Sequence, residues 1–222
     1  MSLVPSVTET LLAWGVEPVA GTRFCEVPGL PHVGGTKNPD VGAIQALSPD
    51  LVVMDEEENR REDHDLLRAA GVEVHVLAVR SLDDVVVQLP GLAERVGVDV
   101  APIEVPPTPS PRLRAFVPIW RRPVMALGGP TYGSSLLAVL GVANVAAGLG
   151  PYPELTLAEA AELAPDVVLA PSEPYPFGPR HVAELSTVAP TILVDGKDLF
   201  WWGARTPGAL TRLREQLDAT GI

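Results

Sequence analysis

The sequence predicts an α/β fold with two pseudo-symmetric lobes, mainly parallel sheets and one helical connector. One stretch occurs twice: residues 40–58 and 156–174 each contain a short amphipathic helix, a Pro-Asp turn, an apolar strand and an acidic loop. An offset of 116 residues relates the copies and carries Glu57 onto Glu173. Strands and helices also alternate at the spacing of βαβ units. Matched units this far apart indicate two similar lobes, because solenoid repeats recur every ~20–50 residues.

The boundary between the lobes follows from the proline content. Residues 102–111 contain five prolines, which favour a stiff extended chain over a helix. We therefore predict an N-terminal lobe over residues 1–80, a helical and proline-rich connector over 81–112, and a C-terminal lobe over 113–222.

The elements of the first lobe are bounded by capping and turn residues. We expect, in order, a strand over 2–5, a helix from Ser6 to Gly15, a strand over 19–21, the helix and strand of the first repeat, a further helix, and a strand over 72–79. A capping box formed by Ser6 and Glu9 should open the first helix, and Asn59 should cap the last one.

The connector begins with an apolar stripe of helical period that starts at Leu82, inside which Pro90 should kink or split the helix. In the second lobe we expect strands over 115–120 and 124–127, a helix containing Leu136, the second repeat, a helix over 181–188, a strand over 191–194, and a final helix after Thr206.

Composition limits the classes of function. The net charge is −12, so the chain lacks the basic footprint of a nucleic-acid-binding protein. No apolar run reaches the length of a membrane-spanning helix, so we do not expect the chain to span a membrane. The single cysteine, Cys25, excludes an internal disulfide. No export signal is visible, and the sequence leaves the compartment open between the cytoplasm and the cell envelope.

Glu57 and Glu173 are the first candidate functional residues. Each follows a predicted buried strand, so each should lie at the carboxyl end of a sheet, where open α/β folds place their sites. Paired carboxylates suit electrostatic docking onto arginines of a partner protein. The alternative is that the run Glu56–Glu58 only favours the N-terminus of the following helix.

Aromatic side chains at strand ends and in loops suggest a binding site for a large, flat, partly apolar ligand. The alternative is ordinary packing between lobes. The candidate ligand-binding residues are Arg23, Phe24, Trp120, Tyr132, Tyr175, Phe177, Trp201 and Trp202.

Catalytic and metal sites receive little support. The histidines His32, His64, His75 and His181 show no ligand spacing, so no protein-bound metal is predicted. Cys25 is a reactive thiolate or, more in keeping with its type, a buried structural residue. We find no set of nucleophile, base and orienting acid, and we expect a protein that is not an enzyme.

Several segments together resemble the helical-backbone metal receptors, the class III substrate-binding proteins of ABC importers for cobalamin, siderophores and heme. They are residues 2–9, 33–40, 48–53, 57–60, 116–120, 128–132 and 172–177, so the resemblance extends over nearly the whole chain. The cobalamin-binding subgroup looks nearest.

The resemblance implies two lobes that hold a corrinoid or related metal chelate between them and deliver it to the subunits of an ABC permease. It also implies that Glu57 and Glu173 are similar to the glutamates that dock onto permease arginines. A monomer outside the cytoplasm, with no cofactor of its own, is expected. The alternative is a cytosolic enzyme or chaperone acting on such a chelate.

Overall fold

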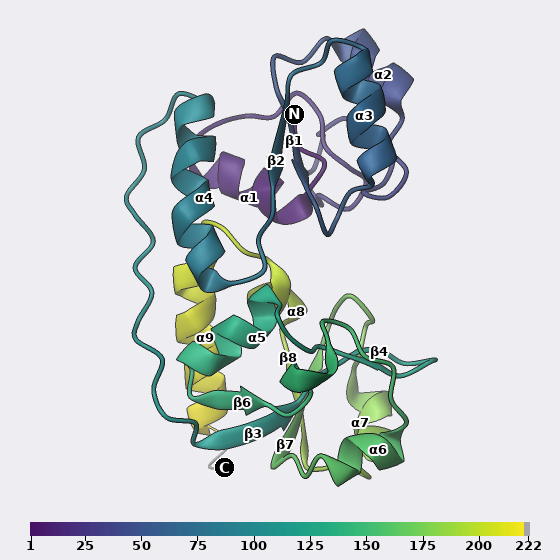
Figure 1. The fold of residues 1–222 in the computed structure, drawn as a ribbon, viewed down its shortest axis with the longest axis vertical. Helices are drawn as coiled ribbons and strands as arrows, with labels where there is room; N and C mark the ends of the chain where they lie inside the picture. Colours follow the sequence, from purple (N-terminus) through teal and green to yellow (C-terminus); the bar gives the residue numbers. More distant parts are fainter. Residues whose placement is uncertain (220–222) are drawn as a thin grey trace. The chain divides into compact units, whose positions relative to one another are not determined.

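The computed structural model describes residues 1–219 (Figure 1); the last three residues of the predicted C-terminal lobe lie outside the described residues. The chain forms two compact units. Unit 1 comprises Met1–Val79, Asp83–Ile103 and Trp202–Arg205, and unit 2 comprises the rest. Unit 1 thus contains most of the helix that we placed in the connector, together with four residues from near the end of the chain.

Unit 1 is built around a short parallel sheet. Strands β1 and β2 pair in parallel, and Ser2 forms a bridge to Val53 on the other side of β1. A core that includes Leu3, Ile44 and Met54 lies against the sheet. The elements are α1 (Pro5–Ala13), α2 (Val41–Leu47), β1 (Val52–Asp55), α3 (Arg61–Ala69), β2 (Val74–Leu77) and α4 (Leu82–Arg95).

Unit 2 has a four-stranded parallel sheet in the order β6-β3-β7-β8, an antiparallel β4-β5 pair, and its own core around Phe116 and Val168. Its elements are β3 (Leu113–Phe116), β4 (Pro118–Trp120), β5 (Met125–Ala126), α5 (Tyr132–Val139), β6 (Val142–Asn144), the 3₁₀ turn η1 (Ala147–Leu149), α6 (Leu157–Glu162), β7 (Val167–Pro171), α7 (Pro179–Leu185), β8 (Thr191–Val194), α8 (Gly196–Phe200) and α9 (Thr206–Ala219).

The predicted repeat is confirmed in its local geometry. Asp40 caps α2 and Thr156 caps α6, each accepting a hydrogen bond from a backbone N–H in the first turn. Each helix is followed within two residues by a residue in the left-handed region, Ser48 after α2 and Ala164 after α6. A buried parallel strand follows in each case.

Two predicted helix caps are wrong. Helix α1 begins at Pro5 without a side-chain cap, since proline at the first helical position needs no hydrogen bond for its nitrogen. Ser6 therefore lies inside the helix, and Glu9 pairs instead with Arg205, whose Nε donates to Oε2 at 2.8 Å. The cap of α3 is Arg60, because the side chain of Asn59 bonds to other segments.

Three other expectations need correction. The strand predicted over 19–21 is only a bridge between Gly21 and His32, and the strand over 2–5 is only the Ser2 bridge. Helix α4 is not split at Pro90: one helix runs from Leu82 to Arg95 with the exposed proline inside it, and buried residues occur on both sides of Pro90. The extended proline-rich segment is confirmed: residues 96–112 contain no helix or strand (Figure 1).

The segment Trp202–Arg205 belongs to unit 1 although both flanking helices belong to unit 2. The backbone N–H of Ala204 donates to Thr10 Oγ1 at 3.1 Å. The guanidinium of Arg205 forms two hydrogen bonds with the Glu9 carboxylate. Gly203 has a φ of +116°, and a Cβ there would lie 2.0 Å from Thr10 Oγ1, so only glycine fits.

Candidate functional site

The turn that carries Glu57 is organised by a buried carboxylate at the end of β1. Asp55 Oδ1 accepts from the backbone N–H of Glu57 at 2.9 Å and of Glu58 at 3.3 Å, and Oδ2 accepts from Val79 N at 3.4 Å. Burial raises the pKa of Asp55 to about 6, and the three N–H groups oppose that rise. Glu57 itself is half-buried.

Asn59 ties the same turn to two further segments of unit 1. Its Nδ2 donates to Leu3 O at 3.2 Å and to Thr36 O at 2.9 Å, while its Oδ1 accepts from Asp55 N at 2.9 Å. Lys37 Nζ donates to the carbonyl oxygen of Glu57. Both peptide groups of Glu57 therefore have a side-chain partner.

The turn that carries Glu173 in unit 2 is held in a different way. Ser172 N donates to Val194 O at 3.0 Å, and Gly196 N donates to Ser172 Oγ at 2.9 Å. A Cβ on Gly196 would lie 2.5 Å from Glu173 Cγ and 2.6 Å from Glu173 N. The start of α8 thus packs directly against Glu173, and a larger residue at position 196 would displace it.

The repeat therefore places both predicted carboxylates after equivalent strands, each within its own unit. Their supports differ, because the residue equivalent to Asp55 is Pro171, which has no carboxylate. Sequence reasoning missed Asp55, Asn59 and Gly196 as supporting residues. Their only signal was the position of each at a strand end or at the start of a helix.

Three of the predicted ligand-binding residues meet in unit 2. The Tyr175 ring lies 5.6 Å from that of Trp120, edge to face, and 4.7 Å from that of Phe177. Arg121 hydrogen-bonds with Tyr175 and also donates to Glu184 Oε2 at 2.9 Å. Trp120 is 44% exposed, so the cluster presents an aromatic surface with a guanidinium beside it.

Three predicted rings are buried: Tyr132, Phe177 and Trp202. The Tyr132 hydroxyl hydrogen-bonds with Thr206 Oγ1 at 3.0 Å, and burial raises the pKa of its phenol. These side chains support the core of their units, which leaves Trp120 and Tyr175 as the accessible rings of the cluster.

Trp201 carries a cation on its face. Lys197 Nζ lies 4.7 Å from the centroid of the Trp201 ring, and both residues belong to unit 2. A cation over an indole face is a favourable electrostatic contact. The half-buried Trp201 is thus accessible in part, unlike its neighbour Trp202.

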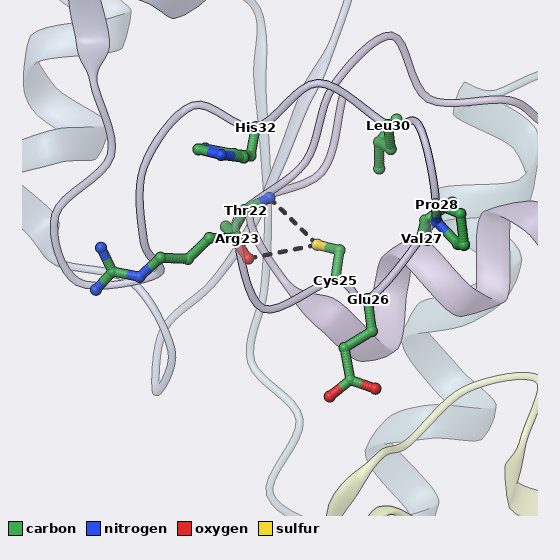
Figure 2. A pocket seen from close by; sticks show the side chains of 8 residues that line it. All are labelled: Thr22, Arg23, Cys25, Glu26, Val27, Pro28, Leu30 and His32. Carbon is green, nitrogen blue, oxygen red and sulfur yellow. Dashed lines mark hydrogen bonds between the residues drawn. The ribbon is translucent and has the colours of Figure 1, made fainter.

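Arg23 and Phe24 lie together in unit 1, with the guanidinium carbon 4.8 Å from the ring centroid. Arg23 also borders a pocket of about 310 Å³, to which Phe24 does not contribute, and Figure 2 shows the side chains of Arg23 and Glu26 extending from it in different directions. The lining residues are Thr22, Arg23, Cys25, Glu26, Val27, Pro28, Leu30 and His32.

Cys25 is buried at one side of this pocket and has hydrogen-bond partners. Its sulfur accepts from Thr22 N at 3.2 Å and lies 3.2 Å from Thr8 Oγ1 (Figure 2 shows the Thr22 contacts). This environment matches the structural interpretation of the cysteine, because a buried thiol with fixed partners is poorly placed to react.

The histidines serve different local roles. The buried His181 accepts from Gly178 N at its Nδ1, 3.0 Å away, and so caps α7. Burial lowers the pKa of His75. Among residues 1–219, no group of three or more potential metal-ligating side chains occurs. Within the same range, no helix combines the length and the apolar character needed to cross a bilayer.

No protein-family model and no curated protein matches this sequence. Solved structures do match. The vitamin B12-binding protein BtuF of Vibrio cholerae has a TM-score of 0.74 and 17% identity, over 98% of this chain and 95% of BtuF. The heme-binding protein BhuT, with two hemes bound, has a TM-score of 0.80 and 22% identity, over 98% of this chain and 97% of BhuT.

A third match is the apo form of the heme-binding protein RhuT from Roseiflexus sp. RS-1. Its TM-score is 0.77 and its identity 22%, over 100% of this chain and 98% of RhuT. All three proteins are described as periplasmic binding proteins. With two α/β units and mainly parallel sheets, the chain has the fold of the class III periplasmic binding proteins, the fold class to which the metal-receptor resemblance pointed.

Proposed function

We propose that this chain is the substrate-binding protein of an ABC importer, that it binds a planar metal chelate, and that it carries no catalytic activity of its own. The observation that carries the proposal is a fold shared over nearly the full length with periplasmic proteins that bind vitamin B12 or heme. By analogy with them, the chain acts outside the cytoplasm.

The accessible aromatic side chains support a planar ligand. Trp120 and Tyr175 in unit 2, and Phe24 in unit 1, offer ring faces and edges on which a macrocycle can stack. A corrinoid related to cobalamin is the first candidate and heme the second, because proteins of this fold bind each.

Glu57 and Glu173 are the proposed docking carboxylates. Each is half-buried at the end of a buried parallel strand, and each lies on a turn fixed by hydrogen bonds or close packing. Such carboxylates are suited to bidentate pairing with arginines of permease subunits.

Ligand titration of the purified chain tests the proposal. The four tryptophans provide an intrinsic fluorescence signal, and calorimetry gives an independent affinity. We expect saturable one-to-one binding of cyanocobalamin, dicyanocobinamide or hemin. Failure of all three, and of ferrichrome as a siderophore control, would reject the proposal. Chemical conversion of a bound chelate would instead favour an enzyme or chaperone acting on it.

A further inference from the structure

Two buried polar side chains fix the backbone on which Glu57 stands. Asp55 is 2% exposed and Asn59 is 6% exposed. They bond to each other through Asp55 N and Asn59 Oδ1, and Asn59 N donates to Asp55 O at 2.9 Å. Buried polar groups with full sets of partners make a rigid local structure.

This pair bonds to three segments of unit 1 outside the turn. Asp55 receives N–H groups from the turn itself and from Val79, after β2. Asn59 donates to Leu3 in the N-terminal segment and to Thr36 in the loop before α2. The turn is therefore fixed to three other parts of unit 1, which is more than a surface turn needs for its own closure.

The orientation of Glu57 depends on this framework. Its N–H is held by the Asp55 carboxylate and its carbonyl oxygen by Lys37, so the direction of its Cα–Cβ bond is set from both sides. Glu56 and Glu58 flank it, and repulsion among three adjacent carboxylates would spread an unsupported turn. A fixed carboxylate loses less entropy on docking than a mobile one.

We propose that Asp55 and Asn59 are positioning residues that hold the Glu57 carboxylate ready for an arginine of the permease. The inference rests on the proposed function, because it assigns a docking role to Glu57. A purely structural role would predict a different result: loss of stability in unit 1 with no specific link to Glu57.

Hydrogen exchange of the free chain tests the framework without any partner. In Asp55→Asn and Asn59→Ala, we expect amide exchange at residues 56–58 to rise about tenfold or more, while exchange in β7 of unit 2 stays unchanged. Asp63→Asn is the matched control, because Asp63 is an equally buried carboxylate of unit 1 whose partner is Arg60. Unchanged exchange at 56–58 in both variants would overturn the inference.

Docking is then measured as stimulation of ATP hydrolysis by the importer permease in nanodiscs, with the ligand-loaded chain. We expect Asp55→Asn and Glu57→Gln each to raise the concentration of the chain that gives half-maximal stimulation about tenfold. In the double variant this concentration should be no higher than in Glu57→Gln alone. Ligand affinity should stay at the wild-type value.

The possible outcomes distinguish the positioning role of Asp55 and Asn59 from the proposed importer function. Additive effects of the two substitutions, or an equal effect of Asp63→Asn, would overturn the positioning role while leaving the importer function in place. Normal docking of Glu57→Gln would remove the docking role of Glu57 and the inference together. Failure of wild type to stimulate any importer permease of the source genome would reject the proposed function itself.

Discussion

Ser48 and Ala164, 116 residues apart, have the same left-handed backbone conformation, with φ values of 44° and 49°. Neither is a glycine, and each precedes a Pro-Asp pair. A non-glycine residue in this region is strained by about 1–2 kcal/mol. The two units thus share the same strained helix end.

Replacing Ala164 with glycine should therefore stabilise the protein by up to about 1 kcal/mol, since relief of strain exceeds the added freedom of the unfolded chain. Ser48→Gly should gain less, because the Ser48 hydroxyl donates to Gln45 O. Urea denaturation measures both. The control is Ala161→Gly, inside α6, which should lose about 1 kcal/mol; a loss of similar size at position 164 would contradict the argument.

Reversing the charge of Glu57 and Glu173 to lysine should abolish importer stimulation, because lysines would repel arginines on the permease. Ligand affinity should survive, and calorimetry checks it. Glu56→Lys and Glu215→Lys form a control pair with the same change in net charge. A double variant that loses its ligand would instead place the two carboxylates in the binding site.

The pH dependence of stability should carry the signature of Asp55. Its pKa in the folded state, about 6, lies above the reference value of 3.8. The folded state therefore binds the proton more tightly than the unfolded state does. The resulting contribution to the free energy of unfolding is fully present below about pH 4 and is lost as the pH rises through about 6. The loss amounts to at most about 3 kcal/mol.

Asp55→Asn should remove that part of the pH dependence, because asparagine does not titrate. Urea denaturation of both proteins from pH 4 to pH 7 gives the comparison. The free energy of unfolding of Asp55→Asn minus that of the wild type should increase as the pH rises. Parallel curves for the two proteins would show that Asp55 does not titrate in this range.

Gly196→Ala should displace the Glu173 turn, because the new Cβ would meet Glu173 atoms at 2.5–2.7 Å. We expect a loss of about 1–3 kcal/mol in stability, together with weaker docking. Gly148→Ala is the control in the same unit, since a Cβ at that position would meet no other atom within 4 Å. If Gly196→Ala had the same stability and docking as the wild type, the Glu173 turn would be able to move away from the new Cβ at little cost.

Removing the exposed ring of Trp120 should weaken chelate binding about tenfold, because the ligand would lose one stacking face. Fluorescence titration of Trp120→Ala against hemin and cyanocobalamin measures the change. Tyr152→Ala removes an equally exposed aromatic side chain of unit 2 and should bind normally. Equal affinity for wild type and Trp120→Ala would exclude this ring from the site.

Local patterns were sufficient to predict most of the fold. The strand over Thr191–Val194 follows from a run of β-branched and apolar residues between Pro190 and Gly196. The repeat predicted two units because helix, turn and strand recur in one order. Helix starts were less predictable, since Pro5 begins α1 ahead of the better capping residue Ser6.

The support of the candidate site could not be predicted, because it depends on contacts between distant segments. Residues 55–58 are four consecutive acids, and nothing in their order reveals that the first is buried while its neighbour Glu56 faces solvent. The bonds from Asn59 to Leu3 and Thr36 join residues 56 and 23 positions apart. Only the folded chain brings them together.

The position of Trp202–Arg205 within unit 1 has a consequence for synthesis on the ribosome. Glu9 and Thr10 are made long before their partners Arg205 and Ala204, which follow them by 196 and 194 residues in the chain. The first unit must therefore wait, incomplete, while nearly the whole of the second is made. A fragment ending at residue 103 would lack the segment that bonds to Glu9 and Thr10.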